Sequence, residues 1–118
     1  MIEILISKVF TTRNLVHLAH WKTKSFSEHT ALGDLYEALV SDIDAVVETY
    51  QGAFGLVDIS ELPAAVSPAN LIKHLEKEVV WIEDNCDKIC QKVGAIENLL
   101  ENLTGTYFKT IYKLKHLA

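Results

Sequence analysis

The chain has 118 residues, 49% hydrophobic and 23% charged, which is enough for one domain around one hydrophobic core. Its formal charge of −5 argues against general binding to DNA or anionic membranes, because both require a positively charged surface. Only two prolines and five glycines are present, and this composition favours long helices over a turn-rich β fold.

The cysteines and apolar segments bear on the compartment. Cys86 and Cys90 have an i, i+4 spacing, which fits neither a CxxC redox motif nor a zinc pair, so we expect reduced thiols. No apolar run reaches the roughly 18 residues of a membrane span. The N-terminal segment contains Glu3 and lacks a small-residue cleavage site, which favours a helix over a signal peptide. We therefore expect a soluble, cytoplasmic protein without a membrane partner.

The first predicted helix covers residues 2–22 and is apolar on two sides. One stripe contains Ile2, Ile6, Val9, Arg13, Val16 and His20. The other side contains Ile4, Leu15 and Leu18. A helix that is apolar on two sides is buried on both, so this helix is expected to form a subunit interface as well as part of the core.

The second predicted helix begins after Ser25, which forms an S-x-x-E capping box with Glu28. Its core stripe alternates by four and three residues: Leu32, Tyr36, Leu39, Ile43, Val46 and Tyr50. The helix is expected to run to about Gln51, since Gly52 is a typical C-terminal stop.

Residues 53–66 form the longest connection, and their length suits a crossover along a bundle. Ser67 and Pro68 predict the start of a third helix, with a heptad pattern formed by Ile72, Leu75, Val79, Ile82, Cys86, Ile89 and Val93. Gly94 is expected to separate it from a fourth helix with the stripe Ile96, Leu100, Leu103, Tyr107, Ile111 and Leu114. The prediction is an all-α single domain over residues 1–118: an antiparallel four-helix bundle with its longer link between the second and third helices. Two hairpins that complete a bundle only in a dimer are the alternative.

Polar residues interrupt the apolar stripe of the first predicted helix. They lie within about 60° of one another and are Arg13, His17, His20 and Lys24. A complementary face of the second predicted helix, within about 100°, carries His29, Glu37, Asp44 and Glu48. Buried polar groups cost about 1–3 kcal/mol unless they are paired, so both faces require an explanation.

Three explanations remain open from the residues alone. The first is a set of ion pairs between these two helices or between subunits. The second is a metal site, because imidazole and carboxylate ligands together suit iron, manganese or zinc. The third is an anion pocket with Ser25 and the first amides of the second helix, lined by Arg13, His17, Lys24 and Lys113 or Lys115. No Glu-x-x-His motif occurs, so a ferritin-type site inside one bundle is not expected.

The segment His20-Trp21, followed by His29 and then by Asp44 and Glu48 with three residues between them, resembles the mini-ferritin (Dps) family. This resemblance implies a ferritin-like fold and a metal site between subunits. The histidines of one chain would face the Asp and Glu of another, with ferrous iron as the substrate and oxygen or peroxide as the oxidant. The family's aspartate one turn after the second histidine falls on Gly33 here, with Asp34 and Glu37 nearby, so the implied ligand set is incomplete.

Further motifs are similar to those of small ferritin-like proteins encoded by bacteriophages. They are His-x-x-His-Trp-x-Thr-Lys-Ser at 17–25, Glu-His-x-Ala-Leu at 28–32, Tyr-Gln-Gly at 50–52 and Tyr-Lys-Leu-Lys at 112–115. The resemblance implies a phage protein that acts in the cytoplasm of the bacterial host.

Two functional hypotheses follow, with an interaction bundle that has no cofactor as the third. The first is a homo-oligomer, at least a dimer through the first two helices, that binds iron or another divalent transition metal, with or without ferroxidase-like activity. Its ligands would be His20, His29, Glu37, Asp44 and Glu48. The second is a non-enzymatic phage protein that sequesters an anionic small molecule, such as a nucleotide immune signal, or blocks a host defence protein. Its contacts would be Arg13, His17, Lys24 and Ser25.

Overall fold

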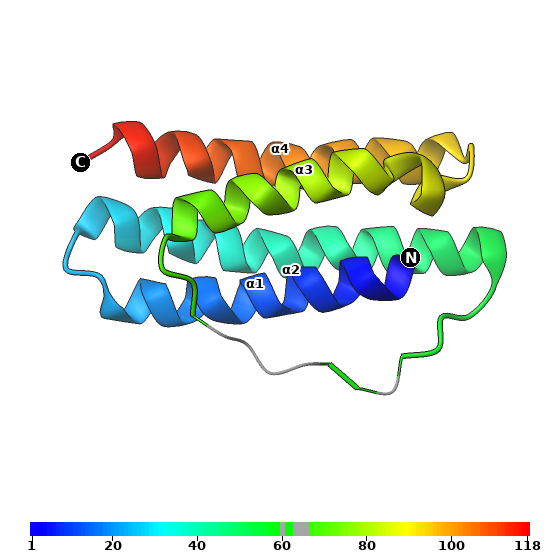
Figure 1. The fold of residues 1–118 in the computed structure, drawn as a ribbon, viewed down its shortest axis with the longest axis horizontal. Coiled ribbons are helices and arrows are strands. Elements are labelled where there is room, and N and C mark those ends of the chain that lie inside the picture. Colours follow the sequence, from blue (N-terminus) through cyan, green and yellow to red (C-terminus); the bar gives the residue numbers. More distant parts are fainter. Residues whose placement is uncertain (60, 63–66) are drawn as a thin grey trace.

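A computed structural model describes residues 1–59, 61–62 and 67–118 of the chain. These residues form four helices and no strand: α1 (Ile2–Lys22), α2 (Phe26–Phe54), α3 (Leu71–Cys90) and α4 (Gly94–His116). Figure 1 shows two helical hairpins, α1–α2 and α3–α4, joined by a long connection that returns along the molecule. The all-helical prediction is thereby confirmed, and the longest link lies between α2 and α3 as expected. Residues 60 and 63–66 of the predicted crossover lie outside the described residues, and residues 53 and 54 belong to α2. Within the described ranges, no helix is long and apolar enough to cross a membrane.

The helices pack around one core in a way that is compatible with a four-helix bundle. Extensive contacts join α1 to α2, α2 to α4 and α3 to α4, whereas α1 contacts α3 more sparsely. Each of these neighbouring pairs runs antiparallel, while α2 and α3 run in the same direction (Figure 1). A bundle completed only by a dimer is therefore wrong, because the two hairpins already pack on each other within one chain.

The helical stripes expected to form the core are largely buried. The fully buried side chains come from all four helices and include Leu5, Leu32, Leu35, Leu39, Leu75, Ile82, Leu100, Leu103 and Tyr107. The second apolar side of α1 is only partly buried: Leu15 is 4% exposed, but Ile4 and Leu18 are 47% and 40% exposed. Ile4 and Leu18 thus remain apolar surface on a single chain.

Two helix boundaries differ from the sequence prediction. α2 continues through Gly52 and ends at Phe54, followed by Gly55 with φ 100° and ψ 175°. α3 begins at Leu71 and not at Pro68, because the side-chain oxygen of Asn70 accepts a hydrogen bond from the Lys73 amide at 3.0 Å. Asparagine is among the best N-caps, so it determines where the helix starts.

Two other helix ends also need correction. α3 ends at Cys90 because Gln91 and Lys92 have positive φ values of 47° and 69°, and Gly94 is the first residue of α4 and not only a break. The N-cap at Ser25 is confirmed, since its Oγ accepts from the Glu28 amide at 3.2 Å. The return bond of a capping box is replaced, because the Ser25 amide donates to Thr23 Oγ1 at 3.2 Å.

Candidate functional site

The tight turn between α1 and α2 brings His20 and His29 into direct contact. Their imidazole rings stack with centroids 3.7 Å apart and planes inclined by 19°. His20 Nδ1 lies 2.6 Å from the backbone oxygen of His29, and His29 Nδ1 lies 2.9 Å from that of His20. A carbonyl oxygen only accepts, so each Nδ1 carries the proton and donates it. In the neutral rings both Nε2 atoms therefore keep a free lone pair.

A second group of rings continues from this pair along the α1–α2 face. His17 stacks on Tyr36 with centroids 3.9 Å apart, and the Arg13 guanidinium carbon lies 5.4 Å from the Tyr36 centroid. The ring of Trp21 lies 4.2 Å from that of His17 and is 67% exposed. We call these six residues the ring cluster: Arg13, His17, His20, Trp21, His29 and Tyr36.

Among the described residues, no carboxylate forms an ion pair with the ring cluster. Arg13 donates a hydrogen bond to Asn14 Oδ1 at 3.1 Å. The ion pairs of the described residues are Met1–Glu3, Lys113–Asp34 and Lys115–Glu76, and none of them involves the ring cluster. Partial burial, followed by the positive charges of Arg13 and His20, lowers the pKa of His17. Ion pairs within a single chain therefore do not account for the polar stripe of α1.

Asp44 and Glu48 lie too far along α2 to reach the histidines of the same chain. Glu37, Asp44 and Glu48 are all exposed on α2. Asp44 follows His29 by fifteen residues, which corresponds to about 22 Å along a helix. In the part of the chain that the structure describes, no group of three or more His, Cys, Asp or Glu side chains could hold a metal ion. Any site that combines these ligands needs a second copy of the chain.

The residues predicted for an anion pocket are only partly available. Lys24 is exposed beyond the end of α1, and the Ser25 oxygen accepts from the Glu28 amide, which leaves its hydroxyl proton as a donor. The lysines of α4 are directed elsewhere, since Lys113 pairs with Asp34 at 3.5 Å and Lys115 with Glu76 at 2.9 Å. The anion-binding candidates that remain are Arg13, His17, Lys24 and Ser25.

Sequence reasoning did not identify Tyr36 as a site residue. Its periodicity placed it in the core stripe, yet its half-buried ring lies below Arg13 and His17 at the surface. Its place beside the polar stripe could have been noticed, since His29 precedes it by two helical turns.

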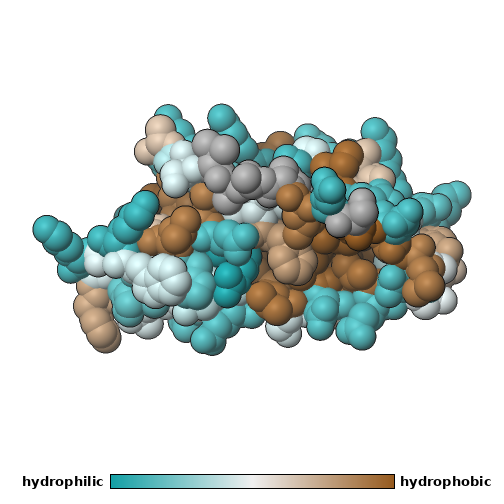
Figure 2. Space-filling view, turned by 90° about the horizontal axis from the view of Figure 1, so that it is seen from below, coloured by the Kyte–Doolittle hydropathy of each residue, from teal (hydrophilic) through white to brown (hydrophobic). Residues whose placement is uncertain are grey.

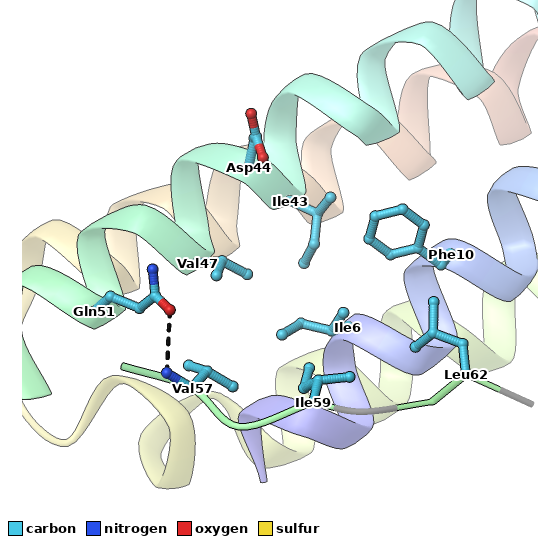
Figure 3. A pocket seen from close by; sticks show the side chains of 9 residues that line it. All are labelled: Ile6, Phe10, Ile43, Asp44, Val47, Gln51, Val57, Ile59 and Leu62. Atoms are coloured by element: carbon cyan, nitrogen blue, oxygen red, sulfur yellow. Dashed lines mark hydrogen bonds between the residues drawn. The ribbon is translucent and has the colours of Figure 1, made fainter. Parts of the chain in front are cut away.

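The other half of the α1–α2 face is apolar. Figure 2 shows hydrophobic side chains gathered over the half that holds the start of α1 and the end of α2. A cavity of about 350 Å³ lies there, lined by Ile6, Phe10, Ile43, Asp44, Val47, Gln51, Val57, Ile59 and Leu62. In Figure 3 the apolar side chains converge, Gln51 Oε1 accepts from the Val57 amide at 3.1 Å, and the Asp44 carboxylate points away from the cavity. Asp44 is thus directed outward, toward solvent or a partner.

Comparison with known proteins reveals a relationship to bacteriophage proteins. A protein of Enterobacteria phage T4, described as an uncharacterised 14.6 kDa protein in the mobD-ri intergenic region, is 29% identical over 100 residues. The match covers 83% of this chain and 75% of the phage protein. No solved structure matches, and the descriptions of the matched family and of the phage protein do not mention a ferritin-like fold. Residues 20–114 match the model of a family of unknown function, DUF5856, and the chain belongs to that family.

Proposed function

We propose that this protein is a phage-type homo-oligomer of ferritin-like bundles that binds a divalent transition metal, with iron as the first candidate, between subunits. The observation that carries the proposal is the reciprocal anchoring of His20 and His29, each of which donates Nδ1–H to the backbone oxygen of the other. Histidines that bind metals are commonly oriented in this way, with one ring nitrogen donating to a carbonyl and the other directed at the metal.

The connectivity of the helices supports the ferritin-like part of the proposal. Neighbouring helices are antiparallel, and one long crossover joins the second helix to the third (Figure 1). Four-helix bundles with one such crossover include the ferritin-like folds.

The stacked rings limit how metal can bind. Their planes are inclined by only 19°, so the two Nε2 lone pairs do not converge on a single ion. Two ions, each held by one imidazole, fit this arrangement. Asp44 and Glu48 of a second copy, exposed and without an ion pair in the described part of the chain, would supply the oxygen ligands.

The experiment combines metal titration with a measurement of mass. Untagged protein is titrated by calorimetry with Fe(II) without oxygen, and with Co(II) and Zn(II), while its mass in solution is recorded. We expect a dimer or larger assembly and binding that is lost in His20→Ala, His29→Ala and the double variant Asp44→Asn, Glu48→Gln. His116→Ala, which removes an exposed histidine of α4, is the matched control and should bind normally. Oxygen consumption after Fe(II) addition then tests for ferroxidase-like activity.

A monomer that binds none of these ions would overturn the proposal. Binding that survives His20→Ala and His29→Ala together would do the same, because the metal would then lie elsewhere.

We infer a second candidate function from Arg13, whose guanidinium lies over Tyr36 and has no carboxylate partner in the described residues. Together with the exposed ring of Trp21, it offers a cation and a stacking surface to an anionic ligand with an aromatic part, such as a nucleotide signal. Nucleotides and cyclic dinucleotides, with inorganic phosphate as the reference, are screened by thermal shift. Stabilisation that Arg13→Ala and Trp21→Ala abolish, while metal binding persists, would favour this candidate over the first.

A further inference from the structure

A carboxyl group lies in the bundle core, away from the ring cluster. Glu78 of α3 is only 6% exposed, and its Oε2 accepts hydrogen bonds from two hydroxyl groups. One comes from Thr12 of α1, and the other comes from Tyr107 of α4 at 2.6 Å. Both hydroxyl-bearing residues are fully buried, so the network joins three helices inside the core.

The proton count determines how the network is ordered when Glu78 Oε2 accepts from both hydroxyl groups. Thr12 has one hydroxyl proton, which it donates to Glu78. Its oxygen therefore accepts from His74 Nε2–H, 2.8 Å away on the same helix as Glu78. Because His74 is only half-buried, the network leads from the core to the surface beside the sparsely packed pair α1 and α3.

Charged and titratable groups from α1, α2 and α3 act on Glu78 and Tyr107. Lys8 of α1 and His74 of α3 act on Glu78, while Asp42 of α2 acts on Tyr107 of α4. Burial raises the pKa of Glu78 above its usual 4.5, against the opposing effects of the hydrogen bonds from Thr12 and Tyr107 and the nearby positive charges. Burial, together with the charge of Glu78, also raises the pKa of Tyr107, so the phenol remains a donor.

We propose that Glu78 is a proton-controlled latch between α1 and α3. With its proton bound, the carboxyl lies neutral in the core and the two helices stay closed. When the proton leaves, the core must hold a charge, and separation of α1 from α3 lets water reach it. The pKa of Glu78 is higher in the folded protein than in the unfolded chain. The stability that its bound proton contributes is therefore fully present below about pH 4.5 and is lost as the pH rises through the folded pKa.

The fluorescence of Trp81 can report on the contact between α1 and α3. It is half-buried on α3, and Lys8 Nζ of α1 lies 5.1 Å from its ring centroid. In a Trp21→Phe background Trp81 is the sole tryptophan, so its emission and the hydrogen exchange of α1 amides are followed between about pH 4 and 9. We expect a red shift and faster exchange with rising pH, and both changes should be absent in Glu78→Gln, which keeps an acceptor for both hydroxyls.

The direction in which a substitution shifts the midpoint of this pH transition distinguishes titration of Glu78 from titration of other groups. Tyr107→Phe removes a donor to the carboxylate and should move the midpoint upward by about one pH unit, a tenfold change in proton affinity. If that variant does not fold, Lys8→Met removes a positive charge outside the core and should shift the midpoint in the same direction. His74→Gln should retain the transition, which excludes the imidazole as its source. A transition unchanged in Glu78→Gln, or no pH dependence in the parent protein, would overturn the proposal.

Discussion

The imidazole of His20 lies so close to the backbone of Gly33 that no larger residue fits there without displacement. A Cβ atom on Gly33 would lie 3.1 Å from His20 Cε1 and 3.3 Å from Nδ1, well inside ordinary van der Waals contact. This is the position at which the resemblance to mini-ferritins places an aspartate. The glycine therefore gives His20 the room to stack on His29, at the expense of a potential ligand.

Gly33→Ala should displace the His20 ring by a few tenths of an ångström and disturb its hydrogen bond to the His29 carbonyl. We expect the affinity for Co(II) or Zn(II) to fall about tenfold, as when a partner that orients a metal ligand is removed, and calorimetry measures it. Gly105→Ala is the control, because a Cβ there meets nothing within 4 Å. It should stabilise α4 by about 0.5–1 kcal/mol and leave metal binding unchanged. Wild-type affinity in Gly33→Ala would show that the position of His20 is irrelevant to binding.

The end of α2 offers two glycines whose substitutions should have opposite effects. Gly52 lies inside the helix with open space around it, so Gly52→Ala should stabilise the protein by about 0.5–1 kcal/mol. Gly55 has φ 100° and ψ 175°, a conformation that is essentially restricted to glycine, so Gly55→Ala should cost about 1–3 kcal/mol. Urea denaturation measures both. Destabilisation by Gly52→Ala would place the helix end where the sequence pattern had predicted it.

Much of the fold follows from residue spacing, because helical periodicity determines which side chains share a face. Leu32, Leu39 and Ile43 were expected in the core and are buried there. The helix ends could not be predicted as well, because several residues compete at each one. Gly52 resembled a stop, yet the helix continues to Phe54, whose ring contacts that of Tyr50 at 4.9 Å between centroids.

For the candidate site, the sequence predicts only where each side chain lies around the axis of its own helix. Arg13, His17 and His20 were placed on one face of α1, and the structure keeps them there. Contacts between helices depend on their separation and register, which a single helix does not reveal. The Glu78 network was missed for that reason, since its partners Thr12 and Tyr107 are 66 and 29 residues away in the sequence.

Stability should distinguish two substitutions of Glu78. Glu78→Leu removes the oxygen that accepts from Thr12 and Tyr107, and a hydroxyl left buried without an acceptor costs about 1–3 kcal/mol. Glu78→Gln keeps an acceptor for both hydroxyls and cannot ionise, so it should be neutral or stabilising at pH 7. Chemical denaturation compares the two, with the exposed Glu83→Gln of the same helix as a control that changes stability by less than about 0.5 kcal/mol. Equal destabilisation by Leu and Gln would contradict the role of the hydrogen bonds.

The ring cluster should make the protein less stable in mild acid. Partial burial and the charges of Arg13 and His20 lower the pKa of His17 below its usual 6.5, so the unfolded chain binds this proton more readily. Its contribution to stability is therefore present above pH 6.5 and is lost as the pH falls toward the lower folded value. Glu78 acts in the opposite direction, so the test compares variants. When the pH falls below 6.5, the urea denaturation midpoint of Arg13→Gln should decline less than that of the wild type. If the two proteins show the same dependence of this midpoint on pH, Arg13 does not act on His17.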